Sequence, residues 1–226
     1  MTSLDKEIQQ QVTPVVEDYL KAIYTMQQKA GQVKTTSLSE HLGVKPPTVT
    51  AMLKTLADLK LVEYAPYRGV ELTKAGERIA LEVIRHHRLI ELYLVEALGY
   101  SWDEVHEEAE ALEHVISEKL EARIAAHLGN PAFDPHGDPI PAMDGKIPDS
   151  SALCLADAPI GKSVRVVRLS DQNSERLRYV AELGLVPGAK VRVSEKAPFD
   201  GPVSIRIGKN AHALDRRLAQ TILVEY

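Results

Sequence analysis

The sequence predicts a mainly α-helical protein with a small β part: a winged helix-turn-helix, a helical segment and a C-terminal β-barrel. Helical periodicity with capping residues dominates residues 13–129, one pair of short alternating strands interrupts it, and four alternating strands follow residue 161. The 226 residues are 44% hydrophobic and 26% charged, which is typical of one or two domains with apolar cores.

Three helices are predicted at the N-terminal end. Thr13 and Pro14 mark the start of a helix that runs to Gly31. Ser37-Leu-Ser-Glu40 is predicted to be a capping box for a short helix that Gly43 ends. Pro46-Pro47 starts the third helix, TVTAMLKTLADLK, whose inward positions are Val49, Met52, Leu53 and Leu56.

A hairpin follows, because LVEYAPY and GVELT alternate in polarity and meet at Tyr67-Arg68-Gly69. Helix, turn, helix and hairpin is the order of a winged helix-turn-helix, in which the third helix enters the DNA major groove. A packing module that binds no DNA is the alternative. The residues expected at DNA are Lys45, Pro46, Pro47, Thr48, Thr50 and Lys54 of the third helix, and Tyr67 and Arg68 of the hairpin tip.

The middle of the chain is acidic, since residues 85–130 hold ten Asp and Glu against four Lys and Arg. Thr73 is predicted to cap a helix reaching Leu98, and Ser101-Trp-Asp-Glu104 to be a capping box for a second helix ending at Gly129. On that second helix, His106, Glu110, Glu113 and His114 fall within about a third of the circumference. They lie beside an apolar stripe made by Val105, Ala109, Leu112, Ile116 and Leu120.

His87 and Glu91 lie one turn apart on the preceding helix, so two antiparallel helices can face six ligand side chains toward each other. A single such residue is usually a solvated glutamate or a hydrogen-bonded histidine, whereas six on facing surfaces favour a bound cation. Oxygen and imidazole donors without thiolate suit Mn²⁺, Fe²⁺ or Co²⁺ better than a structural zinc.

Residues 130–163 are rich in proline, which predicts a linker or an ordered wrap. Beyond them, SVRVVRLS, AKVRVSEKA, PVSIRIG and TILVEY predict a small β-barrel. The one cysteine, Cys154, excludes an internal disulfide. No apolar run of about eighteen residues or signal-peptide core occurs, so we expect a cytoplasmic protein without a membrane segment.

Across nearly its whole length the sequence resembles the diphtheria-toxin-repressor family of metal-dependent transcription regulators. The resemblance lies in EDYLKAIY, KPPTVT, PYRGVELT, HRLIE, VHEEAEALEH and PHGDPIP, in that order. It implies a winged-helix DNA-binding domain over residues 1–74, a helical metal-binding and dimerisation domain over 75–145, a linker over 146–160, and an SH3-like (FeoA-like) barrel over 161–226.

The resemblance also implies a regulatory metal site on Asp18, Glu110, Glu113 and His114, and an ancillary site on His87, Glu91 and His106. A barrel residue would complete the ancillary site, and Asp171, Gln172 and Glu175 are its candidates. Iron sensors of the family have Met at the position of Asp18 and Cys at that of Glu110, so the two carboxylates here resemble the manganese regulators. Short manganese regulators, however, have a glutamate at the position of Lys21.

These features predict a homodimeric, manganese-responsive regulator that binds a pseudo-palindromic double-stranded operator and represses metal-uptake genes. Fe²⁺ is the alternative metal, and Co²⁺, Zn²⁺ or Cd²⁺ are expected to substitute in vitro. A metallohydrolase with Glu104 or Glu108 as base is the alternative from another class. The sequence offers that enzyme no nucleophile, oxyanion donor or substrate loop, so we expect no enzymatic activity and no organic substrate.

Overall fold

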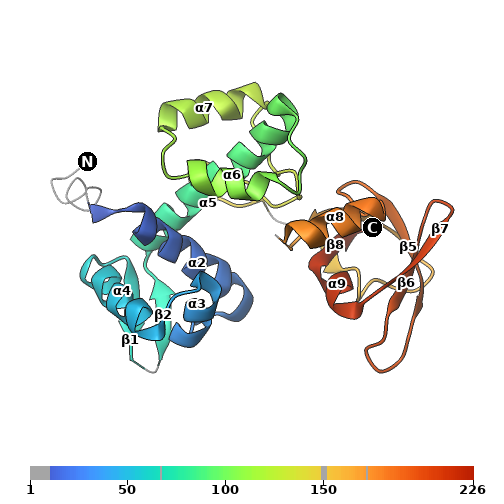
Figure 1. The fold of residues 1–226 in the computed structure, drawn as a ribbon, viewed down its shortest axis with the longest axis horizontal. Helices are drawn as coiled ribbons and strands as arrows, with labels where there is room; N and C mark the ends of the chain where they lie inside the picture. Colours follow the sequence, from blue (N-terminus) through green and yellow to red (C-terminus); the bar gives the residue numbers. More distant parts are fainter. Residues whose placement is uncertain (1–10, 67, 149–151, 172) are drawn as a thin grey trace. The chain divides into compact units, whose positions relative to one another are not determined.

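A computed structural model describes residues 11–66, 68–148, 152–171 and 173–226 of the protein (Figure 1). The chain forms two compact units. One unit comprises Met1–His86 with Pro141–Lys146, and the other comprises His87–Ile140 with Ile147–Tyr226. The long helix α5 (Lys74–Leu98) begins in the first unit and ends in the second.

The first unit contains the three expected helices, α2 (Pro14–Ala30), α3 (Thr35–Leu42) and α4 (Pro46–Asp58). The Thr13 hydroxyl accepts a hydrogen bond from the backbone N–H of Val16, as expected of an N-cap. The left-handed Gly43 ends α3, with a φ of 65°. The side chains that fill the core between these helices are Leu20, Ile23, Leu38, Val49, Leu53 and Leu56, whereas Met52 is only half-buried.

The predicted capping box at Ser37 is wrong, because α3 already begins at Thr35 and has no side-chain cap. The reason lies just before the helix. The backbone groups of Val33 and Val70 form two reciprocal hydrogen bonds, of 3.2 and 2.9 Å, which hold residue 33 in an extended conformation. The chain therefore turns into the helix immediately after this bridge, two residues earlier than the Ser-x-x-Glu pattern indicates.

The predicted hairpin is present as β1 (Val62–Ala65) and β2 (Gly69–Leu72), paired antiparallel from Val62 opposite Leu72 to Ala65 opposite Gly69. Val33 pairs with the outer side of β2. Tyr67 lies outside the described residues, and Arg68 beside it is exposed. The first unit is thus a winged helix-turn-helix whose hairpin is joined to the segment between α2 and α3.

The predicted single helix between the capping box at Ser101 and Gly129 is wrong, because the chain forms α6 (Val105–Leu112) and α7 (Glu118–His127) with a break between them. The Ser117 hydroxyl accepts a hydrogen bond from the backbone N–H of Leu120 at 3.3 Å and so caps the start of α7. The break is stable because this serine satisfies a donor that a continuous helix would have used internally.

The break also corrects the predicted apolar stripe. Val105 and Ala109 are fully buried against Ile90 and Leu94 of α5, and Ile116 packs beside them. The other two members of the stripe, Leu112 and Leu120, are 38% and 49% exposed. The expected capping box at Ser101 is likewise absent, since its hydroxyl donates to the Glu104 carboxylate instead of accepting from the helix.

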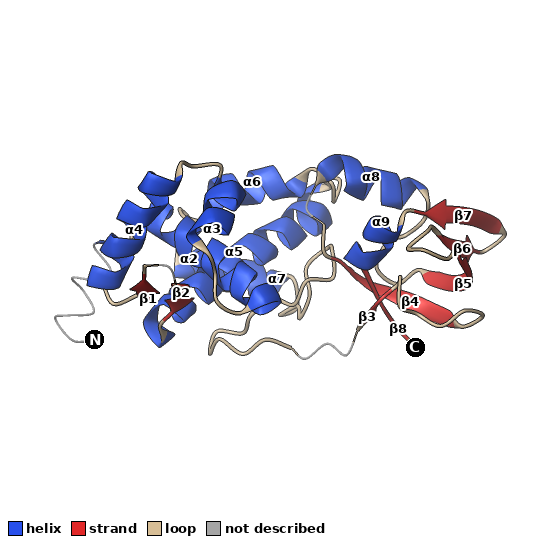
Figure 2. Ribbon diagram, turned by 90° about the horizontal axis from the view of Figure 1, so that it is seen from below, coloured by secondary structure: helices blue, strands red, loops and turns tan. Residues whose placement is uncertain are grey.

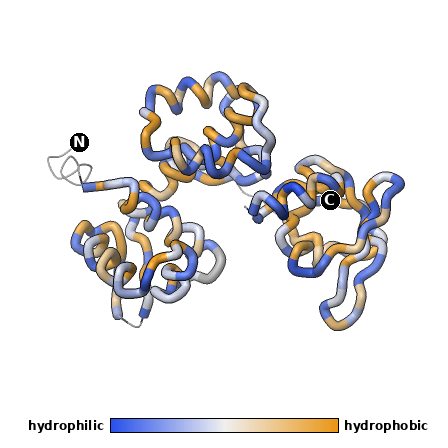
Figure 3. The backbone as a smooth tube through the Cα atoms, viewed as in Figure 1, coloured by the Kyte–Doolittle hydropathy of each residue, from blue (hydrophilic) through white to orange (hydrophobic). Residues whose placement is uncertain are grey.

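The C-terminal part of the second unit is a six-stranded antiparallel sheet in the order β3-β8-β4-β5-β6-β7, with two helices packed on it (Figure 2). The four predicted strands are confirmed as β4 (Ser163–Leu169), β5 (Lys190–Lys196), β6 (Val203–Ile207) and β8 (Ile222–Glu225). Hydrophobic and hydrophilic residues alternate along these strands (Figure 3), and the hydrophobic ones form an apolar core.

Four elements of this sheet domain were not predicted, namely β3 (Leu153–Cys154), β7 (Asn210–Leu214), α8 (Ser174–Glu182) and α9 (Arg216–Thr221). Each is short or carries few buried residues; α8, for example, buries only Leu177 and Val180. Part of the segment predicted as a linker over 146–160 belongs to this domain, since Leu155, Ala156 and Ala158 lie in its core.

Residues 133–140 form an ordered wrap. The Asp134 carboxylate accepts hydrogen bonds from the backbone N–H groups of His136 and Asp138, at 2.9 and 2.8 Å. Arg168 of β4 forms an ion pair with Asp138 at 2.6 Å, and the backbone N–H of Leu169 donates to the carbonyl of His136. This segment is therefore fixed both internally and against β4.

Gly137 is required at the centre of this wrap. Its φ is +85°, and a Cβ atom there would lie 1.9 Å from the carbonyl oxygen of Val167. We expect Gly137→Ala to lower the urea midpoint of unfolding, measured by circular dichroism, by clearly more than Gly145→Ala does. Gly145 has a similar φ of +80°, but a Cβ atom there would meet only the Leu81 side chain, at 3.5 Å. Its replacement therefore costs only the strain of a left-handed backbone conformation in an alanine, about 1–2 kcal/mol. Equal losses in the two variants would contradict a tight approach at Gly137.

Candidate metal centre and nucleic-acid interface

His87 is the centre of a buried group of ligand-type side chains in the second unit. It lies on α5 and is 4% exposed. Its Nδ1 atom is 2.5 Å from a carboxylate oxygen of Glu113, the residue that ends α6. Its Nε2 atom is 3.0 Å from Glu91 and 3.1 Å from Nδ1 of His106. The imidazole therefore lies between two carboxylates that α5 and α6 hold away from water.

Glu110 lies at the edge of this group. Its side chain is 42% exposed, and one of its oxygens is 3.9 Å from both Nδ1 of His87 and Nε2 of His106. Donor atoms of these three side chains lie within 4.8 Å of one another. The spacing of four residues between His106 and Glu110 places both on one face of α6, as the sequence predicts. His114 is near the same end, with Nε2 3.4 Å from the carboxylate of Glu113.

A second group combines Glu91 with two residues of the wrap, Asp134 and His136. All three are buried, and one donor atom from each lies within 4.8 Å of the others. Nδ1 of His136 is 3.6 Å from Glu91, while its Nε2–H donates to the backbone carbonyl of Trp102 at 2.7 Å. The sequence interpretation included Glu91 but missed Asp134 and His136 as candidate ligands. The signal available was a histidine and two aspartates inside a proline-rich segment, where solvated charges would ordinarily lie.

The pKa values of all three residues in this second group are shifted by burial and by the charged neighbours. Burial favours the protonated form of Glu91, but hydrogen bonds from three histidines outweigh it and hold its pKa well below the usual value. Burial opposes the charged form of His136, yet the hydrogen bond to Glu91 raises its pKa to about 9. Burial and the charges of Asp138 and Glu91 raise the pKa of Asp134 to about 7.

These residues fit a divalent cation. Buried carboxylates are tolerated only beside positive charge or dense hydrogen bonding, and here protonated imidazole supplies the charge. All the donors are oxygen or imidazole nitrogen, which suits first-row divalent metals. The buried groups would hold such an ion through Glu91, Glu113 and the histidines between them.

Three other predicted ligands lie on elements other than α5 and α6. Asp18 is half-buried on α2 in the first unit. Asp171 forms an ion pair with Arg176 at 2.9 Å, and Glu175 is exposed in the first turn of α8. Within the described residues, neither Asp171 nor Glu175 is grouped with Glu91, whereas Asp134 and His136 are. Gln172, the third barrel candidate, lies outside the described residues.

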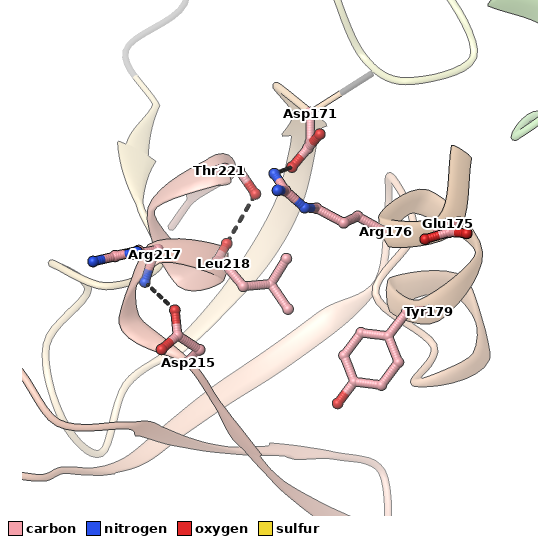
Figure 4. A pocket seen from close by; sticks show the side chains of 8 residues that line it. All are labelled: Asp171, Glu175, Arg176, Tyr179, Asp215, Arg217, Leu218 and Thr221. Atoms are coloured by element: carbon pink, nitrogen blue, oxygen red, sulfur yellow. Dashed lines mark hydrogen bonds and ion pairs between the residues drawn. The ribbon is translucent and has the colours of Figure 1, made fainter. Parts of the chain in front are cut away.

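Asp171 and Glu175 line a cavity of about 420 Å³ in the sheet domain (Figure 4). One wall comes from α8 and the loop before it, and the other comes from α9. The lining residues are Asp171, Glu175, Arg176, Tyr179, Asp215, Arg217, Leu218 and Thr221. Among them Asp171 forms an ion pair with Arg176, and the Asp215 carboxylate accepts a hydrogen bond from the backbone N–H of Arg217.

The predicted DNA-contacting residues lie on the first unit. Five residues at the start and on the outer side of α4 are exposed, namely Lys45, Pro46, Pro47, Thr48 and Lys54. Thr50 is half-buried, and its hydroxyl donates to the carbonyl of Pro46 at 3.0 Å. Arg68 is exposed at the hairpin. The structure thus leaves Thr48 better placed than Thr50 to meet a base edge.

Comparison with known proteins divides the chain into three matched segments. Residues 11–70 match the family described as "Iron dependent repressor, N-terminal DNA binding domain". Residues 73–142 match "Iron dependent repressor, metal binding and dimerisation domain", and residues 153–226 match "FeoA domain". Among the described residues, no helix has the length and apolar composition needed to cross a bilayer.

Individual relatives cover almost the whole chain. The iron-dependent repressor IdeR of Mycobacterium leprae is 34% identical over 92% of this chain and 96% of its own. A solved manganese-dependent transcriptional repressor in complex with manganese is 42% identical, with a TM-score of 0.86 over 92% of this chain and 98% of its own. The structure of ScaR with bound Cd²⁺ is 33% identical, with a TM-score of 0.81 over 93% and 98%.

Proposed function

Because the chain belongs to the iron-dependent, diphtheria toxin repressor family of metal-dependent, DNA-binding transcriptional repressors, we propose that it represses transcription when Mn²⁺ is bound. This membership places it among DNA-binding regulators rather than enzymes, so the metallohydrolase alternative is rejected.

The observation that carries the choice of Mn²⁺ is the chemistry of the ligand set. Every proposed ligand offers a carboxylate oxygen or an imidazole nitrogen, and the two positions expected to hold sulfur in an iron sensor are Asp18 and Glu110. The 42% identity to a manganese-dependent repressor supports the same choice. The 34% identity to IdeR keeps Fe²⁺ as the alternative, and Co²⁺, Zn²⁺ and Cd²⁺ are expected to substitute in vitro.

We assign the regulatory ion to Asp18, Glu110, Glu113 and His114, and the ancillary ion to His87, Glu91 and His106. The approach of His136 to Glu91 supports adding His136, with Asp134 beside it, to the ancillary set. When bound, the metal supplies positive charge that replaces protons on the buried carboxylates and imidazoles. Because Asp18 lies on α2 and the other regulatory ligands on or next to α6, sharing the ion would tie the DNA-binding helices to the dimerisation helices.

That link explains how a metal controls DNA binding. The ion must bind the DNA-competent arrangement more tightly than the alternatives, and the two recognition helices of a homodimer then match successive major grooves of a pseudo-palindromic operator. A repressor that responds to Mn²⁺ most simply controls metal-uptake genes, and it acts in the cytoplasm, where its operator is.

The choice of metal is tested at Glu110. We expect Glu110→Cys to shift the order of metals that activate operator binding from Mn²⁺ toward Fe²⁺, Co²⁺ or Zn²⁺, because a soft thiolate replaces a hard oxygen. The measurement is operator affinity by fluorescence anisotropy under anaerobic conditions, one metal at a time. Glu110→Gln is the control that keeps a hard oxygen. An unchanged order in Glu110→Cys would remove the argument for manganese.

The coupling mechanism is tested at Asp18. We expect Asp18→Ala to leave the fold and the oligomeric state intact but to reduce the effect of Mn²⁺ on operator affinity several-fold, since typical couplings are about 1–3 kcal/mol. Operator affinity is measured with and without Mn²⁺ for both proteins. Glu17→Ala, one position earlier on α2, is the matched control. A ratio equal to that of the wild type in Asp18→Ala would exclude Asp18 as the connecting ligand.

The DNA interface is tested at Arg68 and Thr48. We expect Arg68→Ala to weaken binding to operator and unrelated duplexes alike, and to reduce the salt dependence by roughly one counterion, because Arg68 is assigned to phosphate. Thr48→Ala should instead lower the preference for the operator more than the general affinity. Titrations of both duplexes at several salt concentrations separate these outcomes. A change in sequence preference alone in Arg68→Ala would show that the assignment to phosphate is wrong.

A further inference from the structure

The outer face of the C-terminal sheet carries four cationic side chains on three neighbouring strands. On β4 and β5 the valines Val164, Val166, Val191 and Val193 point into the core, and Arg165, Lys190 and Arg192 alternate with them on the exposed side. On β6, Arg206 is exposed next to buried Ile205. We call Arg165, Lys190, Arg192 and Arg206 the cationic ladder.

The strand register places like charges directly opposite one another in this ladder. Arg165 of β4 is paired with Lys190 of β5, and Arg192 of β5 is paired with Arg206 of β6. Like charges at opposed positions destabilise a sheet by a few tenths of a kcal/mol each, and opposite charges would stabilise it. Solvation alone does not favour this arrangement, because opposite charges at the same positions would be solvated equally well and would stabilise the sheet.

The ladder also holds more positive charge than its neighbours balance, since two acidic residues share the face with its four cationic ones. Over the described part of the chain, none of its four side chains forms an ion pair or a side-chain hydrogen bond. Other arginines of the same domain are paired: Arg168 with Asp138, Arg176 with Asp171, and Arg178 with Asp103. The acidic residues nearest the ladder are Glu225, opposite Arg165 on β8, and Glu195, further along β5.

The rest of this face is mixed, and most of it is small or polar. Its other outward residues include Ser163 on β4, Ser204 on β6, Ala211 and Ala213 on β7, the acidic Glu195 and Glu225, and the half-buried Leu223 of β8. Large exposed hydrophobic residues of the domain, such as Val186 and Phe199, lie in turns rather than on these strands. Residues 161–226 hold twelve Lys and Arg against seven Asp and Glu, although the whole chain has a net charge of −5.

We propose that the cationic ladder binds the phosphate backbone of duplex DNA that adjoins the operator. Neighbouring strands are about 4.8 Å apart and alternate residues about 6.6 Å apart, so the four charges form a compact patch for several phosphates. The face lacks the apolar centre that a protein partner or a bilayer would need. Because contacts to backbone phosphates carry no sequence information directly, this contact adds affinity without sequence preference.

This inference rests on the proposed function, which brings duplex DNA to the protein. The test uses the full-length, Mn²⁺-loaded protein and two duplexes. One is the shortest duplex that the wild type binds in a Mn²⁺-dependent manner, and the other extends it by about two helical turns, roughly 20 base pairs, on each side. Affinities are measured over a range of salt concentrations for wild type and for Arg192→Ala/Arg206→Ala.

For the extended duplex we expect the double variant to lose about two units of slope per subunit, or roughly four for the homodimer, in the plot of log affinity against log salt, and about tenfold or more in affinity near physiological salt. Its affinity for the short duplex stays within about twofold of wild type, because the winged helix is unchanged. Arg192→Lys/Arg206→Lys retains the extended-duplex slope. The matched control, Arg176→Ala/Arg217→Ala, removes two charges from the cavity between α8 and α9 and retains it too.

Folding does not confound the test, because the double variant removes both charges of the opposed Arg192–Arg206 pair and with them their repulsion, so the thermal midpoint is expected to stay unchanged or rise. An unchanged slope on the extended duplex overturns the inference, as does an equal loss in the control pair. A change in the sedimentation behaviour of the DNA-free double variant, with no change in slope, also overturns it and identifies the face as a protein contact. If the wild type shows no Mn²⁺-dependent binding to the short duplex, the proposed function itself fails.

Discussion

The burial of carboxylates around His87 is the constraint on which the second unit depends. Glu91 and Glu113 are 2% and 1% exposed, and His87 separates them with contacts of 3.0 and 2.5 Å. Burying two carboxylates costs far more than burying two apolar side chains, so the surrounding structure must supply positive charge at this point. α5, α6 and the wrap each place an imidazole beside Glu91, through His87, His106 and His136, and the pKa of His136 is raised to about 9.

This arrangement also accounts for the shape of the nearby chain. Glu113 contacts His87 from the position where α6 ends. The break between α6 and α7 therefore forms part of the site. The position of the wrap is also tied to the site. The Asp134 carboxylate accepts a hydrogen bond from the backbone N–H of His136, and this bond fixes where the His136 ring lies. The ligand positions are therefore set by backbone hydrogen bonds as much as by helix faces.

The sequence predicted the fold class, the three N-terminal helices, the hairpin and four strands, because periodicity and capping residues are local signals. It predicted that His87, Glu91, His106 and Glu113 would come together, because spacings of four and seven place side chains on one helix face. It missed the break after Leu112, because Val115 and Ile116 continue an apolar pattern and only Ser117 indicates a new N-cap. It also missed His136, because which irregular segment approaches Glu91 depends on the long-range contacts of Arg88, Arg168 and Gly137, and no periodic pattern records them.

The bridge between Val33 and Val70 has a consequence for the energetics of recognition. Two backbone hydrogen bonds join β2 to the segment that leads into α3, and Leu38 of α3 is fully buried in the core that α4 also fills. The hairpin root and the recognition helix are thus ordered before DNA arrives. These elements therefore lose little conformational entropy when they bind DNA. The difference in DNA-binding free energy between the metal-bound and metal-free protein is then not reduced by the cost of folding this unit on the DNA.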